Sequence, residues 1–293
     1  MTSLRAQIVN RYLRLTMKKK ALHLIPAPTL RATFDARRLP FIPRDVVTEA
    51  VSTPGVRGEW QRPAAGGGGK VILYLHGGGY VFGSVGLYRS MTMPLAKFAG
   101  ADLFSLDYRL APEHPCPAAL DDALAAYDWL LREGAEPSRL LIGGDSAGGG
   151  LTLAALQAIR DRDLPPPAGA FLYSPWTDLA STGASVAANA ETDSMFSEAS
   201  LREGGKRYAG ALDLKDPRVS PLYGSFRGLP PLLLPQRVQR PKGLLQFLLA
   251  RRGRIELAGS PYREASFGIG ALYEAARKRL ELWDLTEAQI QEL

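Results

Sequence analysis

The sequence is poor in the residues that build disulfide frameworks and metal centres. Cys116 is the single cysteine among 293 residues, which excludes a disulfide framework or a cysteine-rich metal site and is typical of a reducing compartment. No apolar run approaches the roughly 20 residues that a membrane-spanning helix needs. The apolar residues 21–25, which follow the three lysines at 18–20, are too few for a signal-peptide core. We therefore expect a soluble, cytoplasmic protein without stable insertion into a membrane.

Acidic residues are missing from one long stretch of the chain. No Asp or Glu lies between Asp216 and Glu256, whereas eight Arg or Lys do. The net charge of +7 invites the hypothesis of a nucleic-acid partner. Residues 1–216, however, hold 24 basic and 22 acidic side chains, and residues 217–293 hold 12 and 7. Because the basic excess is local, we expect no nucleic-acid partner.

Short apolar runs alternate with helical patterns along the middle of the chain. Buried strands are expected at 71–75, 103–106, 140–142 and 171–173, and helices at 118–131 and 147–160. Two further strands are expected on either side of the turn signal at 54–55, at 46–51 and 56–60. Strands that alternate with helices predict βαβ units, and hence a mostly parallel central sheet flanked by helices.

Two helical patterns lie outside this alternation. Near the start of the chain, Leu4, Ile8, Tyr12 and Leu15 recur at helical spacing with Arg and Lys between them, which predicts an amphipathic helix. Residues 198–208 predict a helix between two strands that is long enough to form part of a lid.

The most specific motif is Gly144-Asp145-Ser146-Ala147-Gly148, between an expected strand and an expected helix. A sharp strand-to-helix reversal needs small neighbours, and it exposes the serine hydroxyl at the carboxyl edge of the sheet. The helix N-terminus that follows adds backbone N–H groups and a positive dipole end, which favour developing negative charge. The motif therefore predicts Ser146 as a nucleophile. The structural alternative is a glycine-rich turn that packs the helix on the sheet.

A second glycine-rich motif, His76-Gly77-Gly78-Gly79-Tyr80, follows the strand expected at 71–75. Glycines at a strand end let main-chain N–H groups point at a substrate oxygen, as an oxyanion hole requires. The alternative is a simple turn in which His76 hydrogen-bonds the loop. A third motif, residues 107–115 with Asp121 and Asp122, is interpreted as a proline-fixed loop whose ions brace the oxyanion strand, without a direct catalytic role for His114.

The order and spacing of these three motifs resemble the hormone-sensitive-lipase family of α/β-hydrolase carboxylesterases, in its bacterial branch. Residues 173–178 (YSPWTD), 216–222 (DPRVSPL) and 228–231 (GLPP) also match that family, and the likeness covers roughly residues 30–234. The resemblance implies an α/β-hydrolase fold with Ser146 as the nucleophile and the N–H groups of Gly77, Gly78 and Ala147 as the oxyanion hole. It implies small acyl esters as substrates, and neither a metal nor an organic cofactor.

The resemblance also implies a domain organisation. Residues 1–45 form an N-terminal helical cap segment, and residues 46–293 form the α/β-hydrolase domain. A cap insertion is expected at about 185–215, and the tail at 235–293 is atypical.

The tail lacks the rest of a catalytic triad. Such enzymes need an acid and a histidine base in the chain order Ser, Asp or Glu, His. The three histidines of this chain, His23, His76 and His114, all precede Ser146, and no carboxylate follows the strand expected at 232–234. The triad acid and the triad base are therefore unknown.

Two explanations fit this break. Either the coding sequence changes reading frame near Leu234, or the tail has been replaced by another sequence. A resemblance that is dense to residue 231 and absent after it, beside a sudden enrichment in arginine, favours the frame change.

The expected function is hydrolysis of small carboxylic esters through an acyl-enzyme on Ser146. The alternative is a catalytically impaired protein of the same fold, or a small-molecule binder, because the triad acid and histidine are not found after Ser146. The oligomeric state stays open, with a homodimer among the options.

Overall fold

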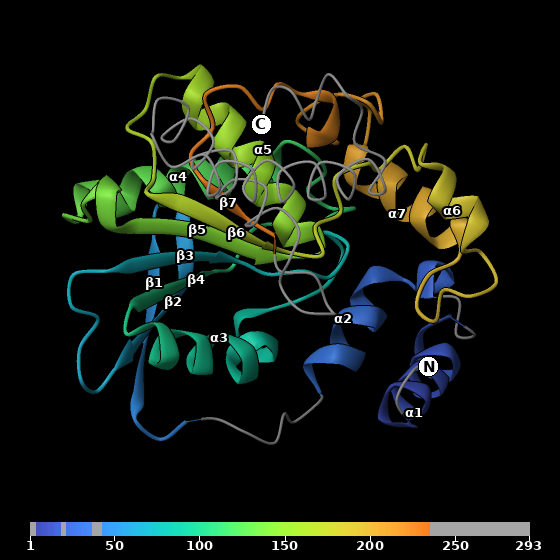
Figure 1. Cartoon of the computed structure of the whole chain (residues 1–293), viewed down its shortest axis with the longest axis horizontal. Coiled ribbons are helices and arrows are strands. Elements are labelled where there is room, and N and C mark those ends of the chain that lie inside the picture. Colours follow the sequence, from blue (N-terminus) through green and yellow to red (C-terminus); the bar gives the residue numbers. More distant parts are fainter. Residues whose placement is uncertain (1–3, 19–21, 37–42, 235–293) are drawn as a thin grey trace, which may run out of the picture.

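The computed structural model describes residues 4–18, 22–36 and 43–234 (Figure 1). Within them lies a seven-stranded sheet with the order β1-β2-β4-β3-β5-β6-β7. The strands are β1 (Val46–Thr53), β2 (Val56–Pro63), β3 (Val71–Leu75), β4 (Asp102–Leu106), β5 (Leu140–Asp145), β6 (Gly169–Tyr173) and β7 (Leu232–Leu233). β2 pairs antiparallel with β1 and β4, and all other pairs are parallel. The predicted mostly parallel sheet is confirmed.

Helices cover both faces of this sheet. α3 (Val85–Ala99) lies on one face, and α4 (Ala118–Arg132) and α5 (Ala147–Asp161) lie on the other (Figure 1). Side chains alternate along β3, so Leu73 and Leu75 join the larger core with α4 and α5, whereas Ile72 and Tyr74 join a smaller core beside α3. Two single-turn 3-10 helices, η3 (Pro137–Arg139) and η4 (Pro221–Tyr223), lie in connecting segments. The sheet and these helices form the layered scaffold that the strand and helix alternation predicts.

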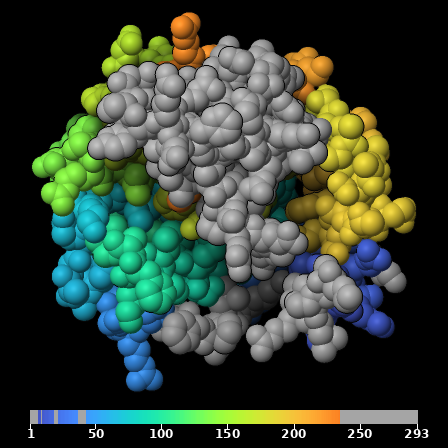
Figure 2. Space-filling view, in the orientation of Figure 1, coloured from blue at the N-terminus to red at the C-terminus, as the bar shows by residue number. Residues whose placement is uncertain are grey.

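Two helical segments lie beside each other next to this scaffold. The N-terminal segment contains α1 (Leu4–Leu13), the π-helix η1 (Arg14–Lys18), the 3-10 helix η2 (Leu22–Leu24) and α2 (Ala27–Asp35). The insertion between β6 and β7 contains α6 (Ala184–Ala188) and α7 (Glu198–Ala209). Figures 1 and 2 show the two segments side by side. α1 and α7 confirm the helices predicted at the start of the chain and at 198–208.

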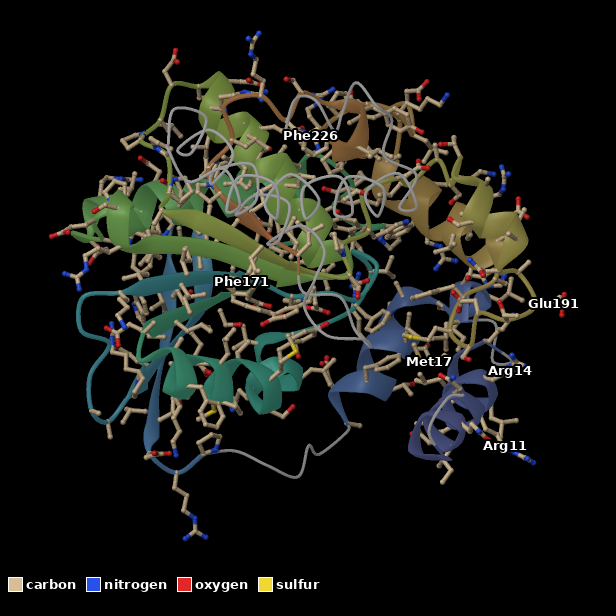
Figure 3. The ribbon with its side chains drawn as sticks, in the orientation of Figure 1. Arg11, Arg14, Met17, Phe171, Glu191 and Phe226 are labelled. Carbon is tan, nitrogen blue, oxygen red and sulfur yellow. The ribbon has the colours of Figure 1, made fainter. Side chains whose placement is uncertain are left out.

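Hydrogen bonds from basic side chains to main-chain carbonyls join these two segments. Nζ of Lys18 donates to the carbonyls of Ala190 at 2.6 Å and Asp193 at 2.9 Å. Arg14 donates to the carbonyl of Glu191 at 3.2 Å, as the labelled side chains in Figure 3 show. The segments expected to form a cap are therefore tied to each other.

None of the helices in the described part of the chain combines the length and the apolar character that a bilayer crossing demands.

Candidate active site

Ser146 lies in a tight turn between β5 and α5. Its backbone has φ 51° and ψ −120°, a conformation that costs a non-glycine residue about 1–3 kcal/mol. Two hydrogen bonds hold the turn: the N–H of Ser146 donates to the carbonyl of Tyr173 at 2.9 Å, and the N–H of Trp176 donates to the carbonyl of Ser146 at 2.8 Å. A strained residue that is held from both sides is typical of a functional site.

The motif glycine after Ser146 allows α5 to pack closely against β3. A Cβ added at Gly148 would lie 2.0 Å from the carbonyl oxygen of Leu75, so no larger residue fits. The glycine-rich turn therefore does pack the helix on the sheet, as the structural alternative predicts. This packing does not exclude a functional role for Ser146, which is half-buried.

A cavity of about 630 Å³ opens at Ser146, which is only half-buried. Its polar floor includes Gly78, Gly79, Asp145 and Ser174. Apolar residues make most of the remaining wall: Met17, Leu22, Leu30, Phe34, Val81, Phe82, Leu87, Met91, Pro175, Trp176, Met195, Phe196 and Leu201. The N-terminal segment, α3 and the insertion thus all border the space in front of the serine.

The loop after β3 brings its glycines to the same cavity. Gly78 has φ 118° and Gly79 has φ 62°, both in the left-handed region that favours glycine. The N–H of Gly77, however, donates to Oδ1 of Asp145 at 2.9 Å. This corrects the expectation for Gly77, whose N–H already has a carboxylate acceptor and is not free for a substrate oxygen. The third glycine, Gly79, lines the cavity instead.

Asp145 fixes the two loops relative to each other. Besides the N–H of Gly77, its carboxylate accepts hydrogen bonds from the hydroxyls of Tyr74 and Tyr88, each at 2.9 Å. Burial and the neighbouring carboxylate both raise the pKa of these two tyrosines, so the hydroxyls stay protonated and donate. Sequence reasoning gave Asp145 no role, although its position directly before the serine, opposite the glycine loop, is the signal that could have indicated one.

His76 supports the glycine loop from behind. It is fully buried, its ring stacks on Tyr108 at a centroid distance of 4.3 Å, and its Nδ1–H donates to the carbonyl of Gly77 at 2.7 Å. The hydroxyl of Tyr108 in turn donates to the carbonyl of His76 at 2.6 Å. Burial lowers the pKa of His76, so its ring is neutral near pH 7. The hypothesis that His76 hydrogen-bonds the loop is confirmed.

The third motif braces the same loop. Arg31 in α2 donates to the carbonyls of Val81 and Ala111, both at 2.8 Å, and forms an ion pair with Glu113 at 2.6 Å. Arg109 pairs with Asp122 at 2.7 Å. These contacts support the structural interpretation of the loop at 107–115.

Neither His114 nor His23 forms a dyad with Ser146. His114 is exposed, and its ring is not part of the cavity wall. His23 does line the cavity, but its Nδ1 is inaccessible and has no partner among the described residues. Within residues 4–18, 22–36 and 43–234, no hydrogen bond joins the Ser146 hydroxyl to a histidine or a carboxylate. The positions expected to supply the acid and the base, in the tail at 235–293, lie outside the described residues.

The part of the chain that the structure describes holds no group of three or more His, Cys, Asp or Glu side chains placed to bind a metal ion.

Comparisons with known proteins place this geometry among hydrolases. A family model described as alpha/beta hydrolase fold matches residues 72–236. An acetyl-hydrolase of Streptomyces hygroscopicus is 46% identical over 192 residues, which cover 66% of this chain and 62% of that protein. The chain thus spans less than two thirds of that curated relative.

Solved structures are similar over more of the chain. An esterase from the bacterial hormone-sensitive lipase family is 34% identical, with a TM-score of 0.74 over 95% of this chain and 99% of that one. The esterase EstE5, soaked with p-nitrophenyl butyrate, is 39% identical, with a TM-score of 0.73 over 80% of this chain and 78% of that one.

Proposed function

Because this chain belongs to the alpha/beta hydrolase fold family, beside the bacterial hormone-sensitive-lipase esterases, we propose that it hydrolyses small carboxylic esters through an acyl-enzyme on Ser146. The observation that carries the proposal is the position of Ser146. It lies in a strained turn at the carboxyl edge of the sheet and borders the same cavity as Gly78 and Gly79.

The proposed reaction has two steps at Ser146. Its Oγ attacks the ester carbonyl carbon, and the carbonyl electrons move to the oxygen to give a tetrahedral oxyanion. We assign the N–H groups of Gly78, Gly79 and Ala147 as donors to that oxyanion, a kind of contact worth about 3–4 kcal/mol per donor. Because no base is assigned, the proton of the Ser146 hydroxyl passes to water. The intermediate then expels the alcohol as an alkoxide, which takes a proton from water. A second water molecule attacks the acyl-enzyme, releases the acid and returns a proton to Oγ of Ser146.

The missing base sets the expected rate. Loss of the histidine base lowers turnover by about a million-fold in a complete triad, or about 8 kcal/mol of transition-state stabilisation. The oxyanion hole and substrate binding alone still accelerate the reaction about 10³–10⁴-fold over the rate in water. We therefore expect slow hydrolysis that still depends on Ser146.

The cavity favours small apolar esters. A volume of about 630 Å³ lies within the range of about 300–1,000 Å³ that is usual for small-molecule sites. Its wall has more apolar than polar surface, which suits acyl chains and apolar alcohols. The name of the Streptomyces relative, an acetyl-hydrolase, supports a short acyl group.

A second candidate function is ligand binding without turnover. It is favoured by one observation, that within the described residues the Ser146 hydroxyl has no histidine or carboxylate partner. Such a protein would hold an ester-sized ligand in the same cavity.

Hydrolysis of chromogenic esters separates the two functions. We expect p-nitrophenyl acetate and butyrate to be cleaved by the full chain above the rate of the Ser146→Ala variant, and the octanoate more slowly. Equal rates for both proteins, together with saturable binding of a non-hydrolysable ester analogue in calorimetry, would support the binder instead.

The underlying DNA tests the frame-change hypothesis for the tail independently of activity. We expect another reading frame after the codon for Leu234 to encode an Asp or Glu and, further on, a His at the family's spacing. If all three frames lack this pair, the tail is a true replacement.

The proposal also includes the expected cellular location, partners and oligomeric state. We keep a cytoplasmic location, because a single cysteine is typical of a reducing compartment. We also keep the absence of a nucleic-acid partner, because the basic excess is local, and a homodimer stays among the oligomeric states to be measured.

A further inference from the structure

The N-terminal helix presents an apolar face to solvent. Ile8, Tyr12 and Leu15 lie four and three residues apart, which places them on one side of the helix, and they are 60%, 59% and 50% exposed. Leu24 in η2, later in the same N-terminal segment, is 74% exposed. Large apolar side chains that are exposed as a group indicate an interaction site.

The opposite side of the same segment already has its partners. Met17 packs against the small apolar core of Ala27, Leu30, Phe34 and Val81. Figure 3 shows Met17 on the inner side of the segment and Arg11 pointing away from the molecule. The segment therefore packs against the rest of the protein through one side, and Ile8, Tyr12 and Leu15 on the other side take no part in that packing.

The sequence of the N-terminal segment carries charge of one sign. Residues 1–34 contain seven Arg or Lys and no Asp or Glu. The exposed Arg11 lies between Ile8 and Tyr12 in sequence, at the border of the apolar face. Arg14 and Lys18 donate to main-chain carbonyls, and neither forms an ion pair with a carboxylate of the described residues. An apolar face bordered by cations is the pattern of helices that lie in a membrane interface.

The segment also borders the site. Met17, Lys18, Leu22 and His23 line the cavity in front of Ser146. The segment that carries the exposed face thus also forms part of the cavity wall, through its opposite side.

From these observations we propose that α1 docks the protein on an anionic lipid surface, with Ile8, Tyr12 and Leu15 in the interface and the exposed Arg11 and Arg14 at the headgroups. Charge complementarity selects this partner, since anionic lipids attract clusters of Lys and Arg. A second copy of the chain would bring two basic segments together. Three side chains also fall short of the roughly 800 Å² per partner that a stable dimer buries.

Vesicle cosedimentation tests this proposal with the full chain. Vesicles of phosphatidylcholine with one third phosphatidylglycerol are compared with pure phosphatidylcholine, at low and at high salt. We expect binding to the anionic vesicles to be at least about tenfold stronger, and to weaken as salt screens the charges. In the Ile8→Ser/Tyr12→Ser/Leu15→Ser variant we expect at least a tenfold loss of binding with an unchanged Tm.

Two further variants keep the result unambiguous. Phe98→Ser removes an 86% exposed apolar side chain from α3 and should bind as the parent does. Arg11→Glu leaves the apolar face intact and should also weaken binding to anionic vesicles.

Equal binding to both vesicle types, no binding, or full binding by the triple variant would overturn the proposal. A concentration-dependent dimer that the triple variant abolishes would assign the face to a second copy. All these measurements can be repeated on Ser146→Ala, so they do not depend on the proposed activity.

Discussion

At the scale of single residues, Asp145 connects the serine turn to the glycine loop. One carboxylate receives the N–H of Gly77 and two buried tyrosine hydroxyls. The oxyanion donors that we propose in this loop are therefore the N–H groups of Gly78 and Gly79. The backbone conformations of these two residues differ in how strictly they require glycine.

Gly78 and Gly79 should respond very differently to replacement by alanine. A Cβ at Gly78 would lie 1.8 Å from the carbonyl oxygen of Phe82, at φ 118°, whereas a Cβ at Gly79 meets no atom within 4 Å, at φ 62°. We expect Gly78→Ala to slow acylation of Ser146 by at least about 100-fold. Gly79→Ala should cost about 1 kcal/mol and slow it by less than about tenfold. Stopped-flow release of p-nitrophenol measures both rates. Equal rates in the two variants would contradict an oxyanion hole in this loop.

Of the candidate site, the sequence predicts the serine turn but not which glycines face the cavity. The strand-to-helix placement of the serine motif follows from the apolar run at 140–142 and the small residues after it, and the structure has that turn. The choice among Gly77, Gly78 and Gly79 could not be predicted, because it depends on the carboxylate of Asp145, which reaches Gly77 only in the folded chain.

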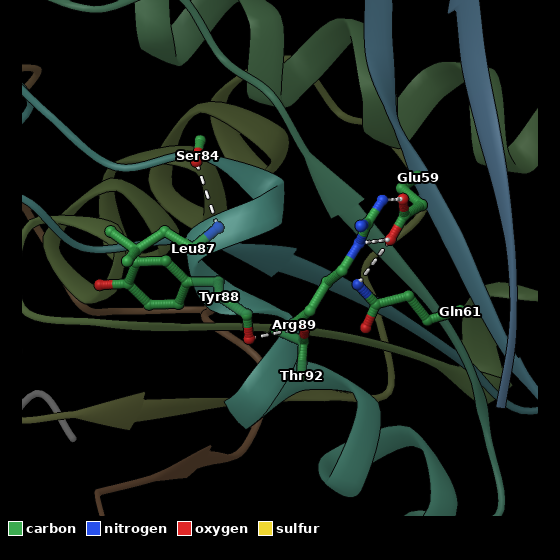
Figure 4. Close-up of polar contacts among 7 residues, drawn as sticks. All are labelled: Glu59, Gln61, Ser84, Leu87, Tyr88, Arg89 and Thr92. Carbon is green, nitrogen blue, oxygen red and sulfur yellow. Dashed lines mark hydrogen bonds and ion pairs between the residues drawn. The ribbon is translucent and has the colours of Figure 1, made fainter. Parts of the chain in front are cut away.

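At the scale of elements, α3 positions one wall of the cavity. Ser84 caps its N-terminus by accepting the N–H of Leu87, and Arg89 pairs with Glu59 on β2 (Figure 4). The amide of Gln61 donates to the same carboxylate at 3.1 Å. The Glu59 side chain is only 6% exposed, so its charge depends on these partners.

Removal of Arg89 should destabilise the protein through Glu59. We expect Arg89→Ala to lower the free energy of unfolding by about 2 kcal/mol, less than for a fully buried pair because Arg89 is itself 40% exposed. Arg132→Ala is the matched control, since Arg132 and Asp128 form an exposed pair within α4, and it should change the free energy by less than about 0.5 kcal/mol. Urea unfolding measures both. Similar decreases in the free energy of unfolding in the two variants would show that the Arg89–Glu59 pair stabilises the protein no more than an exposed pair does.

Most elements follow from sequence patterns, and the exceptions have physical reasons. β3, α4 and α5 agree with their predicted ranges to within one residue. No sequence pattern predicts α3, which contains Gly86 and Pro94, two poor helix formers that tertiary contacts override. The helical spacing of Ile8, Tyr12 and Leu15 predicts α1 but not that this face is the exposed one.

At the scale of the whole molecule, the core contains several buried phenols. Tyr74, Tyr80, Tyr108, Tyr127 and Tyr208 are all fully buried. Burial is the main reason why the pKa of each lies above its usual 10, and it raises the pKa of Tyr127 to about 12. Burial likewise raises the pKa of Cys116 from 9.0 to about 11.

These shifts predict that the protein loses stability in alkali. Each group binds its proton more tightly in the folded state. The contribution of Cys116 is therefore lost as the pH rises from about 9 through 11, and that of the tyrosines as the pH rises above about 10. Cys116 alone accounts for about 2–3 kcal/mol by pH 11. We expect the Tm to fall steeply above pH 9, and the slope between pH 9 and 11 to be smaller in Cys116→Ala. A Tm that stays constant up to pH 11 would contradict the assigned burial of these groups.

The break in the family pattern is also a property of the whole molecule. The match to the family model ends at residue 236, two residues beyond the described part of the chain. The proposed nucleophile and the proposed oxyanion donors thus lie within the described core, while the acid and the base have no assigned residues. If the base is missing, both acylation and the attack of water on the acyl-enzyme should slow. An ester with a good leaving group such as p-nitrophenolate depends less on the base for acylation, so with it the intermediate should accumulate.

Mass spectrometry of the acyl-enzyme tests the central claim most directly. The full chain and the Ser146→Ala variant are each incubated with p-nitrophenyl acetate, quenched in acid and digested. We expect one acetyl group on the peptide that contains Ser146, localised to that hydroxyl by fragmentation, and none on the corresponding peptide of the variant. An unmodified Ser146, or acetylation that is the same in both proteins, would contradict a nucleophilic serine in this cavity.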